Sequence, residues 1–306
     1  MRCRKCGQKA VINLRQHRLS LCKTHFLEWL PAQTLLQIKK FGMIRANERV
    51  LVAVSGGKDS LTLWDILNKL GIQADGLYIH LGIEGPDDYS NKSGLLAGDF
   101  ARERGLTLHV VNLASEYGKT IPQLIDQNNY SVQKPCSVCG LVKRHIMNSY
   151  ALNNGYDCIV TGHNLDDEAS VLFSNTLNWS MERIQRQFPI LPSSPGLVRK
   201  AKPLNHFYER ETTAYALLSG IQYIQEECPF SIGNLTNTNK EFLNQLENTH
   251  PGTKMSFYIS FLKAKKDGFF AHSSEMESDL IEENLCRNCG QPTTAKNLCS
   301  FCKLFS

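Results

Sequence analysis

Residues 51–60, with the sequence LVAVSGGKDS, constrain the fold of this chain more than any other segment. Residues 51–54 are apolar and half of them are β-branched, which predicts a buried strand. Residues 55–57 then turn the chain, and Lys58 leads into SLTLWDILNKL, which has the spacing of an amphipathic helix. Glycines let the backbone approach a ligand closely, and a helix N-terminus presents free N–H groups and the positive end of a dipole. This segment therefore predicts a phosphate-binding loop.

The loop contains neither the GxxxxGK[ST] pattern of a Walker A loop nor the GxGxxG pattern of a dinucleotide-binding loop. The pattern SGGKDS at the end of a strand resembles the PP-loop of ATP pyrophosphatases, enzymes that adenylate a carbonyl oxygen and release pyrophosphate. Lys58 adds a cation for phosphates, and Asp59 with Ser60 could bind Mg²⁺ or cap the helix. The simpler alternative is a structural Gly-Gly turn followed by a helix cap.

Strand and helix patterns alternate along the chain from residue 49. They predict an α/β fold, a Rossmann-like parallel sheet of the PP-loop type with helices on both faces. In such sheets a ligand lies beyond the carboxyl ends of the strands, where SGGKDS also lies. The predicted strands cover 50–55, 76–80, 106–112 and 157–162, and the predicted helices cover 35–43, 60–70, 93–104, 122–128, 139–153, 166–177, 209–220, 240–247 and 257–266. We interpret the Pro-rich and basic stretch 183–203 as a loop and 275–283 as an acidic linker.

The segment TGHNLDDEA, which starts at Thr161, follows another predicted strand and opens a helix with acidic residues. Asp166 and Asp167 could complement the helix dipole. Opposite a phosphate loop, however, a carboxylate is what Mg²⁺ needs. We interpret His163 as a hydrogen-bonding turn residue rather than a metal ligand.

Most of the eleven cysteines are clustered. Because disulfides are uncommon in the cytoplasm, paired CxxC-type spacings there indicate metal sites. The spacing predicts a closed, structural zinc site at each end of the chain, since four such ligands complete a tetrahedron. The first set is Cys3, Cys6, Cys22 and His25. The second set is Cys286, Cys289, Cys299 and Cys302.

Three further cysteines, Cys136, Cys139 and Cys228, accompany the predicted nucleotide-binding domain. They allow three interpretations: a third zinc site that lacks one ligand, a redox relay that carries a persulfide, or a [4Fe–4S] cluster with one iron open to exogenous sulfide. Their spacing alone does not choose between these interpretations. Cys158 and Cys228 each stand alone in the sequence, and a lone Cys228 would by default be a small buried hydrophobic residue.

The composition favours a cytoplasmic protein. At 306 residues, 42% of them hydrophobic, the chain can form a sizeable core. No apolar run reaches the length of a membrane span, and the start MRCRKCGQK has no signal-peptide core. The net charge of +5 is compatible with a polyanionic partner. Basic residues in the first module could contact RNA phosphates or could form a solvated face: Arg2, Arg4, Lys5, Lys9, Arg15 and Arg18.

In order, these motifs resemble the TtuA-type tRNA 2-thiolation enzymes. The resemblance rests on the two terminal metal sets, SGGKDS, PCSVCG, TGHNLDDEA and EECP, and it covers nearly the whole chain. It implies an N-terminal zinc finger over 1–30, a linker helix over 31–48, an ATP-binding catalytic domain over 49–230, a helical extension and linker over 231–283, and a four-cysteine zinc finger over 284–306.

The resemblance also implies roles for individual residues. Lys143, Asp167 and Asp59 would be catalytic, and Cys136, Cys139 and Cys228 would hold an oxygen-sensitive [4Fe–4S] cluster. The residues expected to bind ATP and Mg²⁺ are Ala53, Ser55, Gly56, Gly57, Lys58, Asp59, Ser60, Ile79, Lys143, Gly162 and Asp167.

The implied reaction is the ATP-dependent 2-thiolation of a tRNA uridine. The expected substrate is 5-methyluridine at position 54 in the T loop. A ubiquitin-like carrier with a C-terminal thiocarboxylate would supply the sulfur, and the enzyme would be a homodimer. Three alternatives remain open: thiolation of a wobble uridine or a cytidine, an amide-forming ATP pyrophosphatase that acts on a metabolite, and a zinc-stabilised RNA-binding protein without catalysis.

Overall fold

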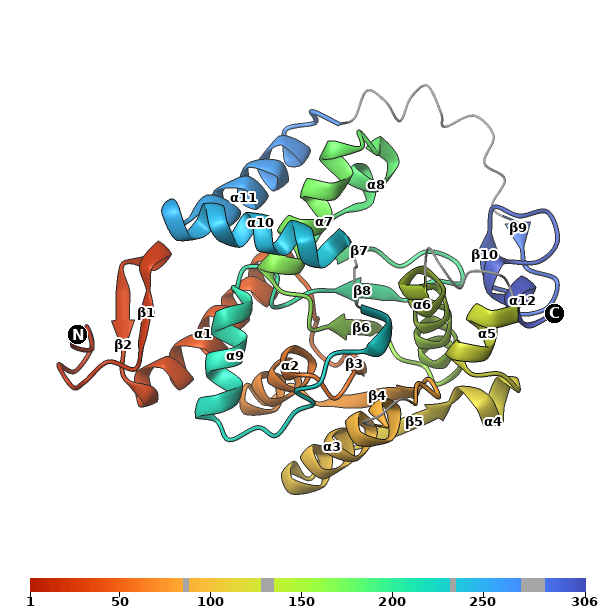
Figure 1. The fold of residues 1–306 in the computed structure, drawn as a ribbon, viewed down its shortest axis with the longest axis horizontal. Helices are drawn as coiled ribbons and strands as arrows, with labels where there is room; N and C mark the ends of the chain where they lie inside the picture. The colour runs from red at the N-terminus through yellow and green to blue at the C-terminus, as the bar shows by residue number, and fades with distance from the viewer. Residues whose placement is uncertain (85–87, 128–134, 232–234, 271–283) are drawn as a thin grey trace.

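The fold is taken from a computed structural model that describes residues 1–84, 88–127, 135–231, 235–270 and 284–306. Its centre is a six-stranded sheet with the order β5-β4-β3-β6-β8-β7 (Figure 1). The four predicted strands are confirmed, with ends shifted by one or two residues. They are β3 (Val50–Val54), β4 (Ala74–His80), β5 (Leu108–Asn112) and β6 (Cys158–Thr161), all parallel.

Strand β3 is the point where the order of the sheet reverses. The chain first adds β4 and β5 on one side of β3 and later returns to add β6 on the other side. Open α/β sheets bind ligands in the crevice beyond such a switch point. Residues 55–57, which directly follow β3, therefore lie where this architecture places a ligand.

The prediction of a loop over 183–203 is wrong. This segment contains part of helix α8 (Met181–Arg186) and two strands, β7 (Ile190–Leu191) and β8 (Arg199–Ala201), which extend the sheet beyond β6. Strand β8 begins with two basic residues, which concealed it in the sequence. The Arg199 side chain is only 7% exposed because it forms an ion pair with Glu48, whose side chain is 13% exposed.

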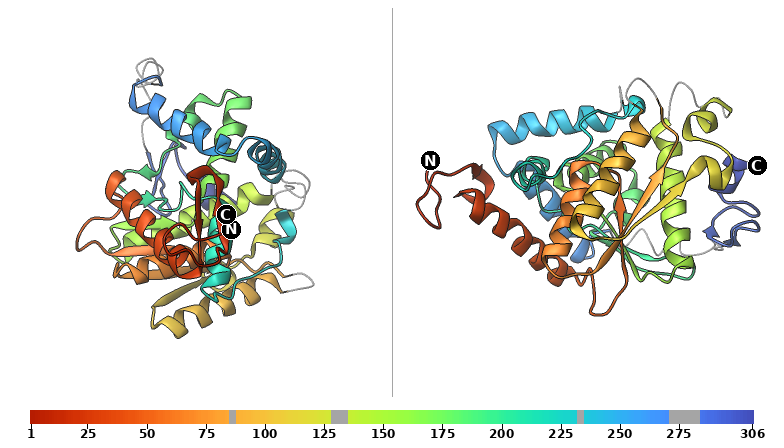
Figure 2. Two further views of the ribbon diagram at one scale, coloured as in Figure 1. Left: turned by 90° about the vertical axis from the view of Figure 1, so that its left-hand side faces the viewer. Right: turned by 90° about the horizontal axis from the view of Figure 1, so that it is seen from below.

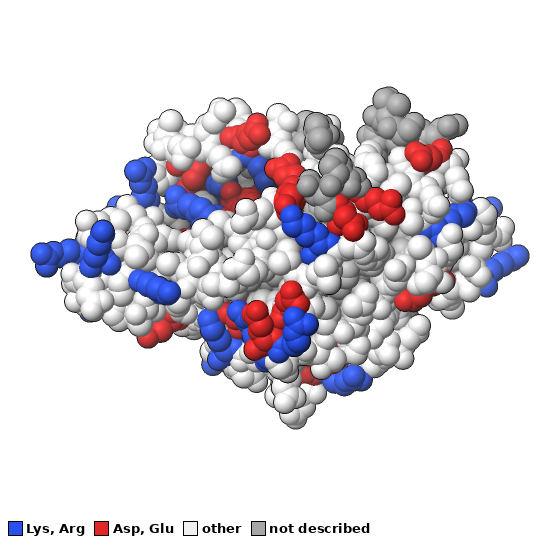
Figure 3. Space-filling view, turned by 60° about the horizontal axis from the view of Figure 1, so that its bottom comes forward, with Lys and Arg blue, Asp and Glu red and all other residues white. Residues whose placement is uncertain are grey.

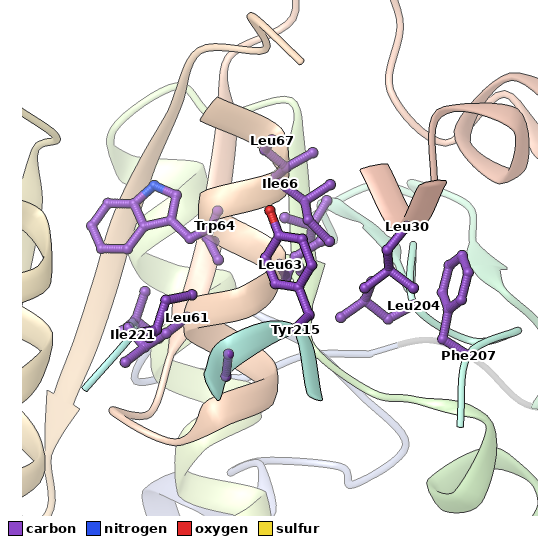
Figure 4. Packing of buried hydrophobic residues seen from close by; sticks show 14 of the residues in the cluster. Leu30, Leu61, Leu63, Trp64, Ile66, Leu67, Leu204, Phe207, Tyr215 and Ile221 are labelled. Carbon is purple, nitrogen blue, oxygen red and sulfur yellow. The ribbon is translucent and has the colours of Figure 1, made fainter. Parts of the chain in front are cut away.

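One face of the sheet is covered by α1 (Lys23–Phe41), α2 (Lys58–Lys69), α3 (Tyr89–Arg104) and α9 (Glu209–Leu218). The side chains of Val50, Val52 and Val54 belong to this core, as expected for alternate residues of a strand. Figure 4 shows the large side chains of this core, which come from several helices, among them Leu30 of α1, Trp64 of α2 and Tyr215 of α9.

The other face is covered by α5 (Ile121–Gln127) and α6 (Pro135–Asn153), with α4 (Leu113–Tyr117) at the end of β5. Leu51 and Ile159, which alternate with the residues of the first face, belong to this second core. The C-terminal helix α12 (Ser300–Phe305) packs against α6 and completes it.

Three further helices lie beyond the β6 side of the sheet, at the top of Figure 1. Helix α7 (Leu165–Leu177) follows β6, and both α10 (Leu235–Thr249) and α11 (Thr253–Lys266) pack against it. A separate small core of Leu165, Leu172, Tyr258 and Phe261 joins α7 to α11. The helical extension is thus attached to the helix that carries the acidic motif.

The two cysteine modules lie at opposite ends of the long axis (Figures 1 and 2). The first contains the hairpin β1 (Ile12–Leu14) and β2 (Leu19–Leu21) with the short 3₁₀ turn η1 (Arg15–His17), and the second contains β9 (Asn284–Leu285) and β10 (Pro292–Thr293). Helix α1 starts at Lys23, twelve residues before the predicted helix 35–43, and runs through residue 30 without interruption. The second 3₁₀ turn, η2 (Pro229–Ser231), follows Cys228.

The prediction of an acidic linker over 275–283 falls outside the described residues. Within the described ranges, no helix has the length and the apolar content needed to cross a membrane.

Candidate active site

The turn between β3 and α2 is closed by the side chains of two serines. The hydroxyl of Ser60 accepts a hydrogen bond from the Ser55 backbone N–H at 3.1 Å and donates one to the Gly57 carbonyl at 3.0 Å. The two serine hydroxyls also lie 3.1 Å apart. These bonds hold the loop in a tight turn in front of the N-terminus of α2, where free N–H groups favour an anion.

Two glycines are required where the loops after β3 and β6 meet. Gly56 has a φ of +74°, and a Cβ atom there would lie 2.3 Å from the Ser93 carbonyl oxygen. A Cβ on Gly162, which follows β6, would lie 2.8 Å from the backbone carbon of Asp59. The loops after β3 and β6 can therefore approach each other and α3 only because both positions lack a side chain.

A pocket of about 320 Å³ opens beside this turn, at the carboxyl ends of β3, β4 and β6. Eight of the residues predicted to bind ATP line it: Ala53, Ser55, Asp59, Ser60, Ile79, Lys143, Gly162 and Asp167. Gly56 and Gly57 belong to the adjoining turn, Lys58 begins α2, and none of the three lines the pocket. The pocket has mostly apolar walls and a small number of polar groups, as is usual for small-molecule sites.

Part of the pocket wall was missed in the sequence. Tyr89, Ser90 and Ser93 line it from α3, and Tyr78 lines it from β4. The Tyr78 hydroxyl lies 2.7 Å from the Ser93 hydroxyl and donates to the Ser90 carbonyl at 2.6 Å. No pattern in the sequence distinguishes these residues from an ordinary helix face, because only the packing of α3 on the sheet turns them toward the pocket.

Lys58 lies at the edge of the pocket between two carboxylates. Its Nζ atom is 3.2 Å from Asp59 Oδ2 and 2.7 Å from Glu209 Oε1. Burial disfavours the charged amine, but these two carboxylates outweigh it and raise the pKa of Lys58. Burial raises the pKa of Asp59, although Lys58 and the Thr212 hydroxyl oppose this. Lys58 is therefore a permanent cation at the N-terminus of α2.

Asp167 is fixed at the start of α7 by a capping box. Its carboxylate accepts from the Asn164 backbone N–H at 3.0 Å, and the Asn164 side chain accepts from the Asp167 N–H at 3.1 Å. Burial opposes ionisation, but Lys240, whose Nζ is 2.6 Å from Asp167 Oδ1, outweighs it and lowers the pKa of Asp167. Asp167 thus presents an ionised carboxylate, the ligand type that Mg²⁺ prefers.

The neighbours of Asp167 have other partners. Asp166 forms an ion pair with Lys254 of α11 and accepts from the Glu209 backbone N–H at 2.9 Å. His163 lies with Nδ1 2.7 Å from the Thr161 hydroxyl, which supports its interpretation as a turn residue.

The three internal cysteines lie next to the pocket. Cys136 is exposed and points its thiol to the Phe230 carbonyl at 3.4 Å, and Cys139 and Cys228 pack at the border of the second core. Burial, and then Cys139 and Cys136, raise the pKa of Cys228, while Lys143 acts in the opposite direction. The pocket residue Tyr89 is close enough to Cys228 that burial and this thiol raise its pKa to about 12.

The terminal sets fit a tetrahedral metal ion. In each set the four ligand atoms lie within 4.8 Å of one another. The Cys6 and Cys22 sulfurs are 3.7 Å apart, as are those of Cys289 and Cys299. Two thiolates on one tetrahedral zinc lie about 3.8 Å apart, given Zn–S bonds of about 2.3 Å.

One thiol of each terminal set also favours ionisation. Desolvation opposes it at Cys3 and Cys286, but hydrogen bonds from backbone N–H groups outweigh desolvation and lower the pKa of both thiols to about 6. Thiolates are the form that binds metal. Cys158, in contrast, is fully buried, and burial raises the pKa of its thiol to about 11.

Comparison with known proteins assigns the chain to a family. Residues 2–27 match the N-terminal LIM domain of the 2-thiouridine synthetase TtuA, and residues 48–223 match the tRNA methyl transferase HUP domain. The tRNA-5-methyluridine(54) 2-sulfurtransferase of Thermus thermophilus is 45% identical, over 100% of this chain and 91% of that protein. The chain belongs to the TtuA family of tRNA sulfurtransferases.

Other relatives agree with this assignment. The TtuA-family enzyme of Thermotoga maritima is 42% identical over 99% of this chain and 96% of its own length, and it too is named a tRNA-5-methyluridine(54) 2-sulfurtransferase. Among solved structures, the U34-tRNA thiolase NcsA from Methanococcus maripaludis, determined with its [4Fe-4S] cluster, has a TM-score of 0.81. The match covers 99% of this chain and 95% of that one at 23% identity, which shows that the two share a fold.

The TtuA-family assignment accounts for the two ends of the chain and the PP-loop, but two charged groups at the site had no signal in the sequence. Glu209 is the first residue of α9, and Lys240 belongs to α10, beyond the expected end of the catalytic domain at residue 230. Both form ion pairs with predicted site residues. Only the packing of α9 and α10 against α2 and α7 brings them there.

Proposed function

We propose that this enzyme uses ATP to activate the C2 carbonyl oxygen of 5-methyluridine 54 in tRNA and replaces that oxygen with sulfur. One observation carries the proposal. Lys143 and Tyr89 line the pocket beside the SGGKDS loop. Both also lie close enough to Cys228 for a Coulombic interaction with its thiol. A carbonyl activated in the pocket would therefore lie next to the thiols that would hold a sulfur source.

The chemistry needs activation because a carbonyl oxygen is a poor leaving group. The C2 oxygen attacks the α-phosphorus of ATP, a new P–O bond forms, and the bond to pyrophosphate breaks. Sulfide then attacks C2, the C–O bond breaks, and the oxygen leaves with AMP. Atoms and charges balance without a net oxidant or reductant: tRNA, ATP and sulfide give thiolated tRNA, AMP and pyrophosphate.

The residues of the chain would stabilise the charges that develop in these steps. Lys58 and the N-terminal N–H groups of α2 would neutralise pyrophosphate as it leaves. Asp59 and Asp167 would hold Mg²⁺ on the phosphates, and Lys143 would face the reacting carbonyl from α6. The backbone of Ala53 and of Ile79 would contact the adenine, and Gly162 would let the nucleotide approach the backbone after β6.

Cys136, Cys139 and Cys228 fit a [4Fe–4S] cluster better than a zinc ion. Among the described residues, only the two terminal sets place their ligand atoms as close together as a single ion needs. A cubane bound by three cysteines would supply a fourth iron at which sulfide is held. Cys139 and Cys228 are half-buried and Cys136 is exposed, and these three residues would hold the cluster.

Partners follow from the same proposal. Most of the charged side chains visible at the end that carries the N-terminal module are basic (Figure 3). The exposed basic residues of this module suit contacts with tRNA phosphates: Arg2, Arg4, Lys5, Lys9, Arg15 and Arg18. We expect a thiocarboxylated ubiquitin-like carrier as the sulfur donor, two structural zinc ions, a homodimer and a cytoplasmic location.

The proposal is tested with protein purified anaerobically and supplied with ATP, Mg²⁺, sulfide and tRNA that contains 5-methyluridine 54. Mass spectrometry of the digested tRNA should show a 2-thio nucleoside at that position, together with AMP and pyrophosphate. Cys136→Ala should abolish the product, and Cys158→Ala, a matched cysteine in the core, should retain it. Thiolation at another base, or equal loss in both variants, would contradict the proposal.

A further inference from the structure

Glu209 joins two lysines from distant parts of the chain. Its Oε1 atom lies 2.7 Å from Lys58 Nζ, and its Oε2 atom lies 3.3 Å from Lys240 Nζ. Lys58 is the first residue of α2, and Lys240 belongs to α10. A single carboxylate thus holds two ammonium groups beside the phosphate-binding turn.

The backbone of Glu209 is fixed, and its side chain is partly exposed to solvent. Its N–H group donates to Asp166 Oδ2 at 2.9 Å, so the start of α9 is tied to the start of α7. Its side chain is 35% exposed, more than the 22% of Lys58 and the 21% of Lys240. The carboxylate can consequently turn toward solvent while both helices and both lysines stay in place.

Lys240 also has a second, deeper partner. Its Nζ atom lies 2.6 Å from Asp167 Oδ1, closer than its contact with Glu209. Helix α10 packs along α7, which carries Asp167. The ammonium group of Lys240 is therefore held beside Asp167, which lines the pocket, even when Glu209 turns away.

With Glu209 in place, the net charge of the ion-paired residues beside the turn is unfavourable for a nucleotide. Two lysines and three carboxylates, Asp59, Asp167 and Glu209, carry a formal charge of −1. A site with this negative charge repels a triphosphate. After Glu209 has moved away, the remaining two lysines and two carboxylates are neutral together before Mg²⁺ binds. Phosphate oxygens accept the same N–H bonds from ammonium groups as carboxylate oxygens do.

We propose that Glu209 is a displaceable carboxylate that occupies the place of the β- and γ-phosphates of ATP, and that Lys240 is a second phosphate-binding lysine beside Lys58. This inference rests on the proposed use of ATP. On nucleotide binding, the phosphates replace Glu209 between the two ammonium groups. The helical extension then contributes directly to the catalytic site through α10.

Calorimetric titration of the purified protein with Mg–ATP and with AMP tests the role of Lys240. Lys240→Met should weaken Mg–ATP binding at least tenfold and leave AMP binding unchanged within twofold, because AMP has no β- or γ-phosphate. Lys240→Arg should restore most of the affinity. Lys263→Met, which removes an exposed lysine of α11, is the matched control and should bind both nucleotides like the unmodified protein.

The direction in which Glu209→Gln changes the affinity for pyrophosphate distinguishes the two roles of Glu209. If Glu209 competes with phosphates, this variant should bind pyrophosphate at least threefold more tightly than the unmodified protein, measured without Mg²⁺. If Glu209 merely positions the two lysines, its loss should weaken binding, and that result would overturn the inference. Equal Mg–ATP affinity in Lys240→Met would also overturn it. An unmodified protein that binds no ATP at all would instead reject the proposed function.

Discussion

The backbone N–H of Ile224 donates a hydrogen bond to the carbonyl oxygen of Gly56 at 3.0 Å. Gly56 belongs to the turn after β3, and Ile224 lies four residues before Cys228. Ile224 is buried, so water competes little for this bond. The main chain therefore joins the phosphate-binding turn directly to the segment that carries the third internal thiol.

Gly56→Ala should disrupt this junction. A Cβ at this position would meet the Ser93 carbonyl at 2.3 Å, and the φ of +74° costs an alanine about 1–2 kcal/mol by itself. We expect a loss of more than about 2 kcal/mol in the free energy of unfolding and no measurable ATP binding. Gly57→Ala is the control for stability, because the φ of Gly57 is −87° and an added Cβ would lie 3.4 Å from the Ser55 hydroxyl. Equal destabilisation in both variants would contradict this account.

Removing one ligand of the N-terminal set should remove one metal ion. Cys6→Ser should lower the zinc content, measured by elemental mass spectrometry, from about two ions per chain to one. It should also loosen the start of α1, because Leu14, Leu21 and Phe26 form a common core beside the metal set. Cys158→Ser should keep both ions. Retention of two ions by the Cys6 variant would show that these four residues are not a zinc site.

Phe301 holds the C-terminal module on the catalytic domain. Its ring stacks on His145 of α6 with centroids 3.7 Å apart and planes at 8°, and it also contacts Tyr117 and Phe305. Phe301→Ala should destabilise the protein by about 3–5 kcal/mol and make the C-terminal module sensitive to limited proteolysis. Phe269→Ala, which removes a side chain that is 76% exposed, should change neither the stability nor the sensitivity to proteolysis.

Glu211 should make stability depend on pH. Burial raises the pKa of this carboxyl to about 7, against hydrogen bonds from the Tyr208 N–H and the Gln16 side chain. Because the folded-state pKa is above the unfolded value of 4.5, the folded state binds the proton more tightly. Its contribution to stability is complete below pH 4.5 and is lost as pH rises toward about 7.

Glu211→Gln tests this dependence. Between pH 5.5 and 7.5, the unmodified protein should lose about 2 kcal/mol of unfolding free energy relative to the variant, measured by denaturant titration. Glu116→Gln, a change at an exposed carboxyl, should leave the pH dependence as it is. Parallel curves for Glu211→Gln and the unmodified protein would show that Glu211 ionises normally in the fold.

Local features of the sequence predicted the parts of the site that are built by neighbouring residues. The strand, turn and helix around Ser55, Gly56 and Lys58 form from consecutive residues, so their pattern is readable without the fold. The terminal metal sets are readable for the same reason, since CxxC spacing already brings two ligands onto one turn. Buried charge obscured β8, because Arg199 looks like a surface residue until its ion pair with Glu48 is seen.

By itself, the sequence determined the kind of sheet, the phosphate-binding turn and the residue types that serve metals and phosphates. Only the tertiary structure decided which distant groups complete the site: Tyr89 from α3, Glu209 from α9 and Lys240 from α10. The physical reason is that these positions depend on how helices pack, and packing depends on the whole core rather than on neighbours in the chain. A lysine such as Lys240 reads as a solvated helix residue until α10 lies against α7 and brings its ammonium group to Asp167.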